Sequence, residues 1–558
     1  MKQDAIKEKP WLQFWPKHLP TELVIPQTPL FEYVETSAKR YSDKTALIFY
    51  GTKISYEDLW KSILKFAGYI TSLGVKKRDR VSVYVENSPQ FVITYYGTMR
   101  ANAVVVPINP MLKGEELKYI LNDSGSRVIV TTPDHLPLLK DVINDTSVEK
   151  LIVGRYNDYI SDKPEIPVPS ALQKEAEIPS DVIKWKDIMD KGSMPGEVEV
   201  GADDLAVLPY TSGTTGVPKG CMHTHFTVYS NTVGSYHWLS NTSSSVHLCT
   251  VPIFHVTGMI HPLNAALYAG GTIVMLTRWD RETAVQAIEK YKVTHWVNIA
   301  TMVIDILSMP GIEKRDVSSI LFIGGGGAPL PAAIGEKLDK LMGLKYVEGY
   351  GLTETISQTH FNPPDRPKMQ CIGIPSFGVE AKIIDPDTGE ELPPNKTGEL
   401  LVSGPEVCKG YWNKPEEDAT LFREINGERY LRTGDLCYMD DEGYFFVVDR
   451  VKRMINRAGF KVWPAAVENM LYKHPAIKEA CVVRTPDPRV GEEVKAYVVL
   501  KTEYEGKATA EDIIEWSKKQ MAAYEYPRII EFVSELPKSA SGKIMWKELE
   551  EKERTART

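Results

Sequence analysis

The sequence predicts a large α/β domain with two sheets of mainly parallel strands, then a β-rich subdomain, and finally a small, mobile α+β domain. Between about residues 45 and 350, apolar runs rich in β-branched residues alternate with amphipathic helical patterns. From about 370 to 449, strand patterns are separated by Pro, Gly, Asn and Asp turns. The residues after 453 mix helices and strands. These changes of pattern define the predicted regions.

The first region alternates strands and helices. Near-continuous apolar strands between helices indicate parallel sheets covered on both faces, and ligands of such folds bind beyond the carboxyl ends of the strands. Two glycine-containing clusters follow strands of this kind, at 210–220 and 324–327. The expected strands are 80–86, 103–108, 127–132, 205–208, 246–253, 272–276, 295–299 and 319–323, and the expected helices are 89–100, 114–122 and 281–290.

The later regions are predicted in the same way. A charged run at 450–453 is the expected linker, so the first domain covers 1–449, with the β-rich subdomain at about 370–449, and the second covers 454–558. The expected strands are 380–384, 398–403, 443–448, 480–483 and 495–500, and the expected helices are 464–473 and 510–520.

Length and composition exclude several classes of protein. A chain of 558 residues is too long for one core, and a net charge of −8 argues against a nucleic-acid binder. The six cysteines are scattered without a C-x-x-C pair, so we expect a reducing compartment rather than disulfides or structural zinc. The sequence shows neither a signal peptide nor an apolar run of about 20 residues. We therefore expect a cytoplasmic protein with no integral membrane segment; no oligomeric state is predicted.

The segment 210–220, YTSGTTGVPKG, is the most informative part of the chain. It contains three glycines, four Ser or Thr hydroxyls and one lysine, with no acidic residue. Free backbone amides, hydroxyl donors and an ammonium group are what a triphosphate requires of its binding loop. The segment is not a Walker loop, because Lys219 is followed by glycine. Taken alone, it also fits an ordinary surface turn.

Further segments carry matching chemistry in a fixed order. The run 324–330, GGGGAPL, permits a flat ring to approach the backbone. In 349–355, GYGLTET, Tyr350 could stack on a purine, and Glu354 could hold Mg²⁺ together with phosphate oxygens.

Two later segments complete the set. In 430–435, YLRTGD, the Asp435 carboxylate could accept hydrogen bonds from two ribose hydroxyls, and Arg450 adds a fork of donors. The segment 537–543, PKSASGK, places a second lysine on a loop rich in Ser and Gly. Each segment alone also fits a turn, a core position or a surface charge, but together they are a specific pattern.

With these motifs, the chain resembles over nearly its whole length the adenylate-forming superfamily of acyl-CoA synthetases, peptide-synthetase adenylation domains and firefly luciferases. The resemblance implies that a carboxylate attacks the α-phosphorus of ATP to form an acyl-adenylate and pyrophosphate. The thiol of coenzyme A then displaces AMP to form a thioester. ATP, Mg²⁺, CoA and a small carboxylic acid are the implied ligands, and no nucleic acid is expected.

The resemblance also implies roles for individual residues. Lys543 would bridge the carboxylate and the α-phosphate, which is electrostatic and orientational catalysis. Thr353 and Glu354 would contact phosphate and metal. The other nucleotide contacts would come from Thr211, Ser212, Gly213, Thr214, Thr215, Lys219, Gly327, Ala328, Pro329, Glu348, Gly349, Tyr350, Asp435 and Arg450.

For the second step, the resemblance implies that the C-terminal domain swings about Lys452 as the hinge and presents Gly459, which leaves room for the pantetheine arm. Three positions depart from the common pattern: Asp449 stands where the linker usually has glycine, Tyr430 or Leu431 replaces a Trp, and Ala300 replaces a Pro. The last change is expected to reshape the acyl pocket.

The acid substrate is predicted from the pocket residues His255, Gly258, Ala300 and Gly351. Relatives that activate acetate carry a tryptophan where this chain has Gly351, so its absence leaves room for several carbons, at about 0.8 kcal/mol per buried CH₂. A medium-chain or longer fatty acid is the leading expectation. A branched, aromatic or short hydroxy acid (for example 4-hydroxybutyrate) stays open, since His255, Thr257 or His261 could bind a hydroxyl; His255 either gates the pocket or is structural. The sequence is also compatible with transfer of the acyl group to a carrier protein, and with a catalytically silent nucleotide-binding regulator.

Overall fold

The computed structural model describes residues 9–173, 176–211, 217–327, 329–450, 453–458, 460–538 and 544–555. By their contacts, the residues divide into two units. Unit 1 takes the chain up to 380 together with 402–431, and unit 2 takes 381–401 together with the chain from 432 onward. The domain boundary predicted near 450 and the hinge at 450–453 stay predictions.

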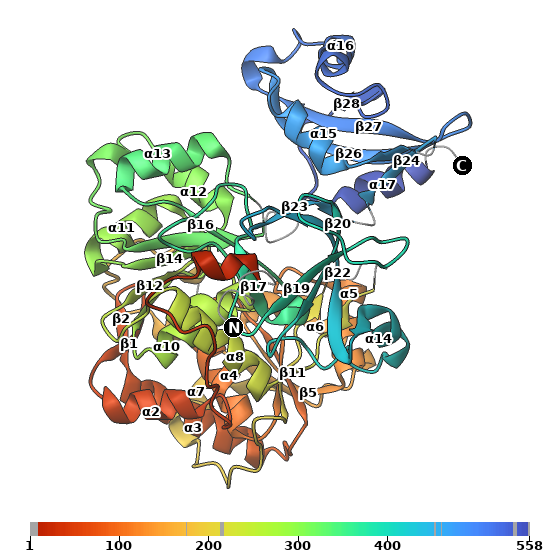
Figure 1. Ribbon diagram of the computed structural model, residues 1–558. Helices are drawn as coiled ribbons and strands as arrows, with labels where there is room; N and C mark the ends of the chain where they lie inside the picture. Colours follow the sequence, from red (N-terminus) through yellow and green to blue (C-terminus); the bar gives the residue numbers. More distant parts are fainter. Residues whose placement is uncertain are drawn as a thin grey trace. The chain divides into compact units, whose positions relative to one another are not determined.

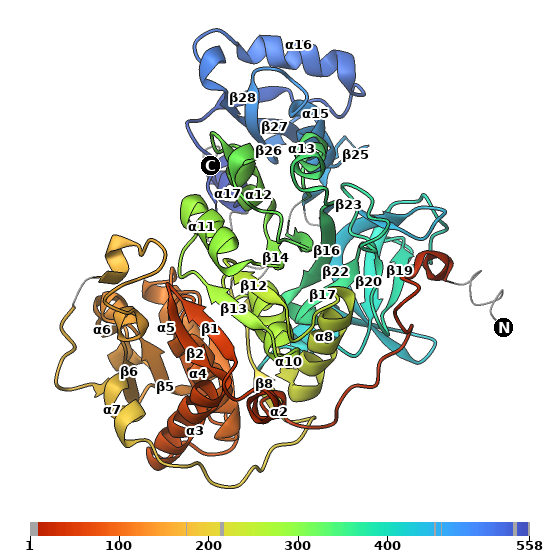
Figure 2. The same ribbon diagram turned by 90° about the vertical axis from the view of Figure 1, so that its left-hand side faces the viewer.

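One sheet of unit 1 has seven strands in the order β11-β8-β4-β3-β5-β6-β7, and all neighbours from β8 to β7 are parallel. Helices cover both of its faces, because Val105 packs in one core cluster with α3 and α4 whereas Val104 and Val106 pack in another with α5 and α6. Figure 2 shows these helices around β5 and β6. The elements are α3 (Tyr56–Ser72), β3 (Arg80–Tyr84), α4 (Pro89–Arg100), β4 (Val104–Pro107), α5 (Gly114–Ser124), β5 (Ser126–Thr131), α6 (Leu136–Lys140), β6 (Lys150–Val153), β7 (Ile183–Lys184), β8 (Leu205–Val207) and β11 (His223–Thr224).

The second sheet of unit 1 has nine strands in the order β18-β17-β16-β15-β14-β12-β13-β1-β2. Its strands are parallel from β16 to β1 and antiparallel at both edges. Helices α11 (Arg281–Tyr291), α12 (Ala300–Leu307) and α13 (Ala332–Met342) lie beside β14 and β16 (Figure 1). The strands are β1 (Thr45–Phe49), β2 (Thr52–Ser55), β12 (Val246–Cys249), β13 (Thr272–Met275), β14 (His295–Asn298), β15 (Phe322–Gly326), β16 (Val347–Leu352), β17 (Ser357–Phe361) and β18 (Ile374–Pro375).

The predicted α/β class with parallel sheets is confirmed. One strand of this region is displaced: we expected it at 319–323 with the glycines in the loop after it, but β15 continues through Gly326. The glycines are required inside the sheet, since a Cβ on Gly325 would lie 1.8 Å from the carbonyl oxygen of Asn298 and one on Gly326 would lie 2.5 Å from that of Gly349.

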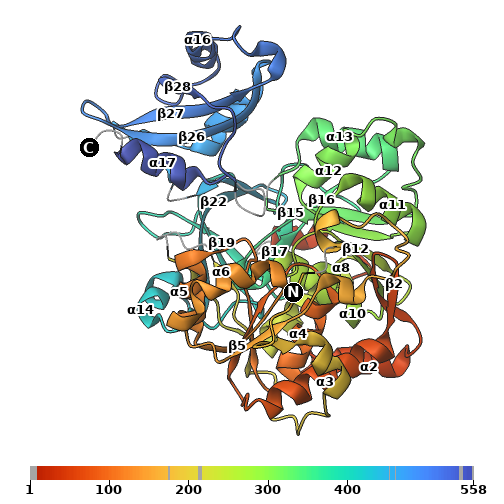
Figure 3. The ribbon, with the colours of Figure 1, turned by 180° about the vertical axis from the view of Figure 1, so that it is seen from behind.

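Unit 2 contains most of strands β19 (Glu380–Ile384), β20 (Gly398–Ser403) and β22 (Glu428–Met439) and all of β23 (Phe445–Arg450). In this sheet β20 lies between β19 and β22, and β23 pairs with β22. A second sheet has the order β25-β24-β27-β26, with β28 beside β27. Helices α16 and α17 lie on opposite faces of that sheet (Figure 3). These elements are β24 (Ile455–Arg457), β25 (Phe460–Val462), α15 (Pro464–Leu471), β26 (Ile477–Asp487), β27 (Gly491–Leu500), α16 (Ala510–Gln520), β28 (Ile529–Phe532) and α17 (Trp546–Thr555).

All six cysteines lie among the described residues and are buried, and none of them forms a disulfide. Burial raises the pKa of the thiols of Cys221, Cys249, Cys437 and Cys481, so these four are held as neutral thiols. Within the described part of the chain, no helix combines the length and the apolar character needed to cross a membrane.

Candidate active site

The predicted phosphate-binding segment forms a short hairpin. Strand β9 (Tyr210–Thr211) pairs with β10 (Lys219–Gly220), and Thr211 lies opposite Lys219. Ser212, Gly213, Thr214 and Thr215 lie outside the described residues. Lys219 is 6 % exposed, and its ammonium forms an ion pair with Glu417 and lies 5.1 Å from the ring centroid of Tyr411.

The segment 408–412 runs beside β10 and brings Tyr411 to this lysine. Trp412 donates its backbone N–H to the carbonyl oxygen of Gly220 at 2.8 Å, and Cys221 forms an antiparallel bridge with Tyr411. The Tyr411 hydroxyl then donates to Glu354 Oε1 at 2.7 Å. Glu354 is also fixed through its backbone, because its carbonyl oxygen accepts the N–H of Cys408 at 2.8 Å. Tyr411 therefore connects the lysine and the carboxylate that we predicted as phosphate and metal ligands.

Glu417 and Tyr411 were missed in the sequence. Glu417 lies on helix α14 (Pro415–Leu421), which starts with Pro415 and has three acidic residues in its first turn. A proline at the first helical position followed by acidic residues is a signal for a helix start. It does not reveal which of those acids faces a lysine 198 residues earlier.

The segment after β16 is a strained turn. Thr353–Thr355 form a 3₁₀ turn, and the two residues after it, Ile356 and Ser357, have φ of 47° and 113°. Asn231 of helix α8 (His225–Trp238) holds this turn by donating Nδ2 to the carbonyl oxygens of Thr355, Ile356 and Gln358 at 3.0, 3.3 and 3.1 Å.

Thr353 itself is fixed by a buried histidine. The carbonyl oxygen of Thr353 accepts a hydrogen bond from His223 Nε2 at 2.8 Å. Burial lowers the pKa of His223 to about 4, so this ring is neutral at physiological pH. The predicted pair Thr353 and Glu354 is thus held from several sides by its backbone, with both side chains half-buried.

The predicted adenine-binding residues lie just after β15 and inside β16. Gly327 is exposed with φ of 86°, and Pro329 is exposed; Ala328 lies outside the described residues. Gly349 is closely packed, since a Cβ there would lie 2.7 Å from the Phe361 ring. Tyr350 is half-buried, and its ring centroid lies 6.0 Å from that of His360.

Glu348 has a different environment from its neighbours. It is 4 % exposed and accepts the backbone N–H of Leu330 at 3.1 Å and of Gln370 at 3.3 Å. Burial raises the pKa of this carboxyl to about 7. Its carboxyl group therefore ties the loop after β15 to the segment around residue 370.

The predicted acyl-pocket residues lie on several elements of unit 1. His255 is exposed, and its ring centroid lies 5.7 Å from that of Phe254. Ala300 is buried at the first position of α12. A Cβ on Gly258 would lie 2.2 Å from the carbonyl oxygen of Pro252, so only glycine fits there without a backbone shift.

Gly351 and His261 are both closely engaged by the surrounding protein. A Cβ on Gly351 would lie 1.6 Å from the carbonyl oxygen of Ser357, because β16 and β17 change register at this point. The ring nitrogens of His261 both form hydrogen bonds with serines, Nδ1 with Ser235 Oγ at 2.8 Å and Nε2 with Ser357 Oγ at 3.2 Å. His261 is therefore engaged by the protein itself.

Asp435 and Arg450 belong to unit 2. They lie opposite each other on β22 and β23, and Arg450 Nε lies 2.9 Å from Asp435 Oδ1. The unusual Asp449 is buried and accepts the backbone N–H groups of Arg450 and Ala465, each at 2.7 Å. This explains how the linker accommodates an acid where glycine is common. Lys452, Gly459 and Lys543 lie outside the described residues.

Comparisons with known proteins agree with this architecture. The family model described as AMP-binding enzyme matches residues 34–412, and that of the AMP-binding enzyme C-terminal domain matches 466–543. A long-chain-fatty-acid–CoA ligase of Bacillus subtilis is 37% identical over 556 residues, which cover 98% of each chain. A feruloyl-CoA synthase of Amycolatopsis is 33% identical over 508 residues, which cover 90% of this chain and 94% of that one.

A solved structure shows the same fold. The crystal structure of ATP-bound MatB from Rhodopseudomonas palustris matches with a TM-score of 0.84 at 27% identity and covers 96% of this chain and 100% of that one. The chain therefore belongs to the adenylate-forming superfamily of AMP-binding enzymes, as an AMP-forming acyl-CoA synthetase, an acid–thiol ligase.

Proposed function

We propose that the enzyme activates a medium-chain or longer fatty acid. The observation that carries this proposal is the match, over 98% of both chains, to a relative named long-chain-fatty-acid–CoA ligase. The absence of a bulky side chain at Gly351 also supports a substrate with several carbons. An aromatic acid is the second candidate, because another full-length relative is named feruloyl-CoA synthase. A short hydroxy acid bound through His261 is less favoured, since serines occupy both ring nitrogens.

In the first step, a carboxylate oxygen bonds to the α-phosphorus of ATP and pyrophosphate leaves. Lys219 and the hydroxyl-rich segment 211–215 bind the β- and γ-phosphates in this proposal, so Lys219 must release Glu417 when ATP enters. Asp435 and Arg450 bind the ribose hydroxyls. The exposed Gly327 and Pro329, with Tyr350, accept the adenine ring.

Glu354 and the Thr353 hydroxyl fit a magnesium ion. Among the described residues, no cluster of three or more acids, histidines or cysteines could hold a metal. A single carboxylate suits Mg²⁺ that is bound mainly by phosphates and water. When bound, Mg²⁺ neutralises phosphate charge and so assists the departure of pyrophosphate. The role of Tyr411 is to orient the Glu354 carboxylate through its 2.7 Å hydrogen bond.

Lys543 neutralises the carboxylate and the α-phosphate as these two anions approach. For the second step, the C-terminal domain turns about Lys452, and Gly459 admits the pantetheine arm. The thiolate of CoA then bonds to the acyl carbon, and AMP leaves as the acyl–oxygen bond breaks.

A panel of acids tests the proposal. ATP–pyrophosphate exchange is measured with saturated acids of two to sixteen carbons, hydroxy acids and aromatic acids, and AMP and thioester are then measured with free CoA. Maximal exchange with acids of six carbons or more supports the proposal, whereas maximal exchange with ferulate-like or short hydroxy acids would replace it. Exchange without thioester would indicate a carrier-protein acceptor, and no exchange with any acid would indicate a silent regulator.

Lys543→Ala tests the assigned step. Adenylation is expected to fall by about 10²–10³, while preformed acyl-adenylate still reacts with CoA. Lys538→Ala is the matched control, because Lys538 lies on the same segment and pairs with Glu479 at 2.8 Å. Equal loss of both half-reactions in Lys543→Ala would contradict the role.

A further inference from the structure

His223 lies between two segments that must meet at the triphosphate. It follows Lys219 by four residues, at the start of β11, and is fully buried. Strand β11 pairs with β8, which precedes the hairpin of Lys219, so both ends of this hairpin are anchored in the seven-stranded sheet. The His223 ring is hydrogen-bonded to Thr353, which is 130 residues away in the sequence. Its side chain therefore joins the phosphate-binding hairpin to the turn that carries Glu354.

The two neighbours of the His223 ring determine which nitrogen carries its proton. A carbonyl oxygen only accepts hydrogen bonds, so Nε2, which lies 2.8 Å from the Thr353 carbonyl oxygen, carries the proton. Nδ1 of the neutral ring is then an acceptor, and the Thr227 hydroxyl lies 3.2 Å from it. The same hydroxyl lies 3.0 Å from the Thr224 carbonyl oxygen, to which it can donate instead. The donor that holds Thr353 is thus a ring N–H with a fixed direction.

The first half of the turn has two further backbone contacts. The carbonyl oxygen of Thr353 also accepts the N–H of Ile356 at 3.1 Å, which closes the 3₁₀ turn. The carbonyl oxygen of Glu354 accepts the N–H of Cys408 at 2.8 Å. Neither contact involves His223, so the turn does not depend on this histidine for its closure.

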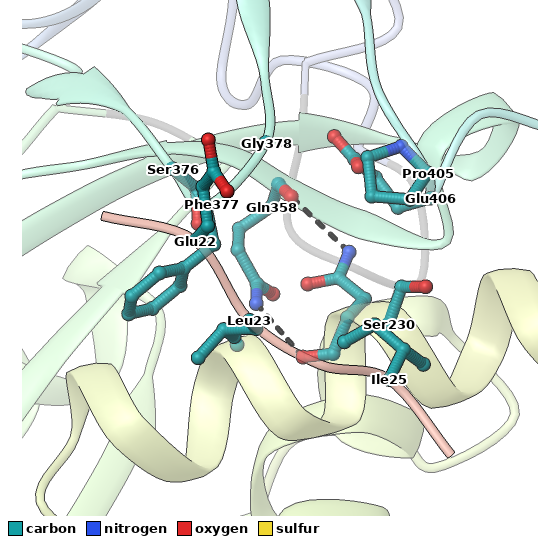
Figure 4. Close-up of a pocket in the computed structure, with 12 residues that line it drawn as sticks. Glu22, Leu23, Ile25, Ser230, Gln358, Ser376, Phe377, Gly378, Pro405 and Glu406 are labelled. Atoms are coloured by element: carbon teal, nitrogen blue, oxygen red, sulfur yellow. Dashed lines mark hydrogen bonds between the residues drawn. The ribbon is translucent and has the colours of Figure 1, made fainter. Parts of the chain in front are cut away.

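The second half of the turn is fixed from helix α8. Asn231 Nδ2 donates to the carbonyl oxygens of Thr355, Ile356 and Gln358. In return, Gln358 Nε2 donates to the carbonyl oxygen of Asn231 at 3.1 Å, and Figure 4 shows Gln358 with both of these hydrogen bonds as dashed lines. Loss of the His223 contact should therefore displace Thr353 and leave the rest of the turn in place.

We propose that His223 is a positioning residue of the adenylation step. Through the Thr353 carbonyl oxygen, it fixes the Thr353–Glu354 pair relative to the Lys219 ammonium. This role rests on the proposed function, in which these groups bind one magnesium–triphosphate from two sides. A misplacement of about 1 Å in such an arrangement lowers the rate about a hundredfold. His223 is fully buried and acts through Thr353 rather than on the substrate.

His223→Leu removes both ring nitrogens and keeps an apolar side chain in the buried position. In ATP–pyrophosphate exchange, kcat is expected to fall about ten- to hundredfold, and the Mg²⁺ concentration for half-maximal exchange should rise. His223→Gln keeps an N–H donor near the place of Nε2 and should recover kcat to within about fivefold of the parent enzyme. An unchanged kcat in His223→Leu would overturn the proposal, and so would an equal loss in His223→Gln.

His225→Leu is the matched control for a loss of stability. His225 lies two residues further along the chain and is equally buried, but its Nδ1 accepts the backbone N–H of Leu30 at 3.1 Å instead of contacting the turn. Both leucine variants should lower the midpoint of urea denaturation, because each leaves a buried backbone group without its partner. Only His223→Leu should lower kcat. An equal loss of kcat in the two variants would reduce His223 to a structural role.

A second pair of variants serves if His223→Leu does not fold. Asparagine and glutamine at this position carry the same amide group, but the shorter asparagine places its N–H too far from the Thr353 carbonyl oxygen. His223→Gln should therefore keep a kcat at least about fivefold above that of His223→Asn. Equal values of kcat would overturn the proposal.

Glu354→Gln separates this inference from the proposed function. Loss of exchange in Glu354→Gln together with full exchange in His223→Leu would overturn the role of His223 alone. Full exchange in Glu354→Gln would overturn the proposed role of Glu354, and with it the role of His223.

Discussion

Replacing Glu417 by glutamine is expected to tighten ATP binding and to weaken the free protein. In the structure, the ammonium of Lys219 is paired with the Glu417 carboxylate, and the two side chains are 7% and 30% exposed. A phosphate oxygen can bind this lysine only after the carboxylate has left it. Removing the negative charge therefore removes a competitor of ATP.

The magnitude follows from the burial of the pair. Two charges at about 4 Å interact by about 4 kcal/mol at an effective dielectric constant of 20, and by about 1 kcal/mol in water. Because Glu417 is partly exposed, we expect a gain of about 1–2 kcal/mol, which lowers the KM for ATP about five- to thirtyfold. In the absence of ATP, a buried ammonium without its partner should lower the free energy of unfolding by about 1–3 kcal/mol.

The two effects have opposite signs and are measured separately. ATP–pyrophosphate exchange gives the KM for ATP, and urea denaturation without nucleotide gives the stability. Glu416→Gln is the matched control, since Glu416 is the exposed neighbour on the same turn of α14. An unchanged or higher KM in Glu417→Gln would refute the reasoning, because it would mean that Glu417 does not compete with phosphate for Lys219.

Three further predictions concern the same site. Tyr411→Phe removes the 2.7 Å hydrogen bond to Glu354 and should raise the Mg²⁺ concentration needed for half-maximal exchange about tenfold; an unchanged requirement would contradict the orienting role. Gly351→Ala should lower stability in urea by about 1–3 kcal/mol, because its methyl would meet the Ser357 carbonyl oxygen at 1.6 Å; full stability would mean that β17 shifts freely. The pKa of the Glu348 carboxyl is raised from 4.5 to about 7, so its contribution to the free energy of unfolding is full below pH 4.5 and is lost as the pH rises through 7. Glu348→Gln should therefore flatten the pH dependence of the free energy of unfolding measured in urea. The same pH dependence in the variant and the parent protein would contradict this.

Much of the fold could be predicted from local patterns. The bounds of α4, α16, β19 and β20 agree with the predicted ranges. Clear cap residues mark the starts of the two helices, Ser88 before α4 and Thr509 before α16. The predicted range of β15 was wrong, because a run of glycines usually indicates a loop. Here the glycines are required by the close approach of the Asn298 and Gly349 backbones, which the local sequence does not reveal. Such close approaches depend on residues far away in the sequence.

The predicted motifs identified the family, but not how their residues are held. Glu354 accepts a hydrogen bond from Tyr411, which is 57 residues away in the sequence. Lys219 pairs with Glu417, which is 198 residues away. Local sequence patterns contain no information on such pairs. Likewise, Glu348 was predicted at the adenine site, and nothing in its neighbours indicated that its carboxyl group accepts the backbone N–H groups of Leu330 and Gln370.

Because all six native thiols are buried, the folded enzyme should react little with maleimides. Cysteines introduced at exposed positions, such as Glu336 in unit 1 and Lys519 in unit 2, would be labelled selectively with a pair of dyes. Energy transfer between the dyes would then test the proposed turning of the C-terminal domain, without first deleting any native cysteine.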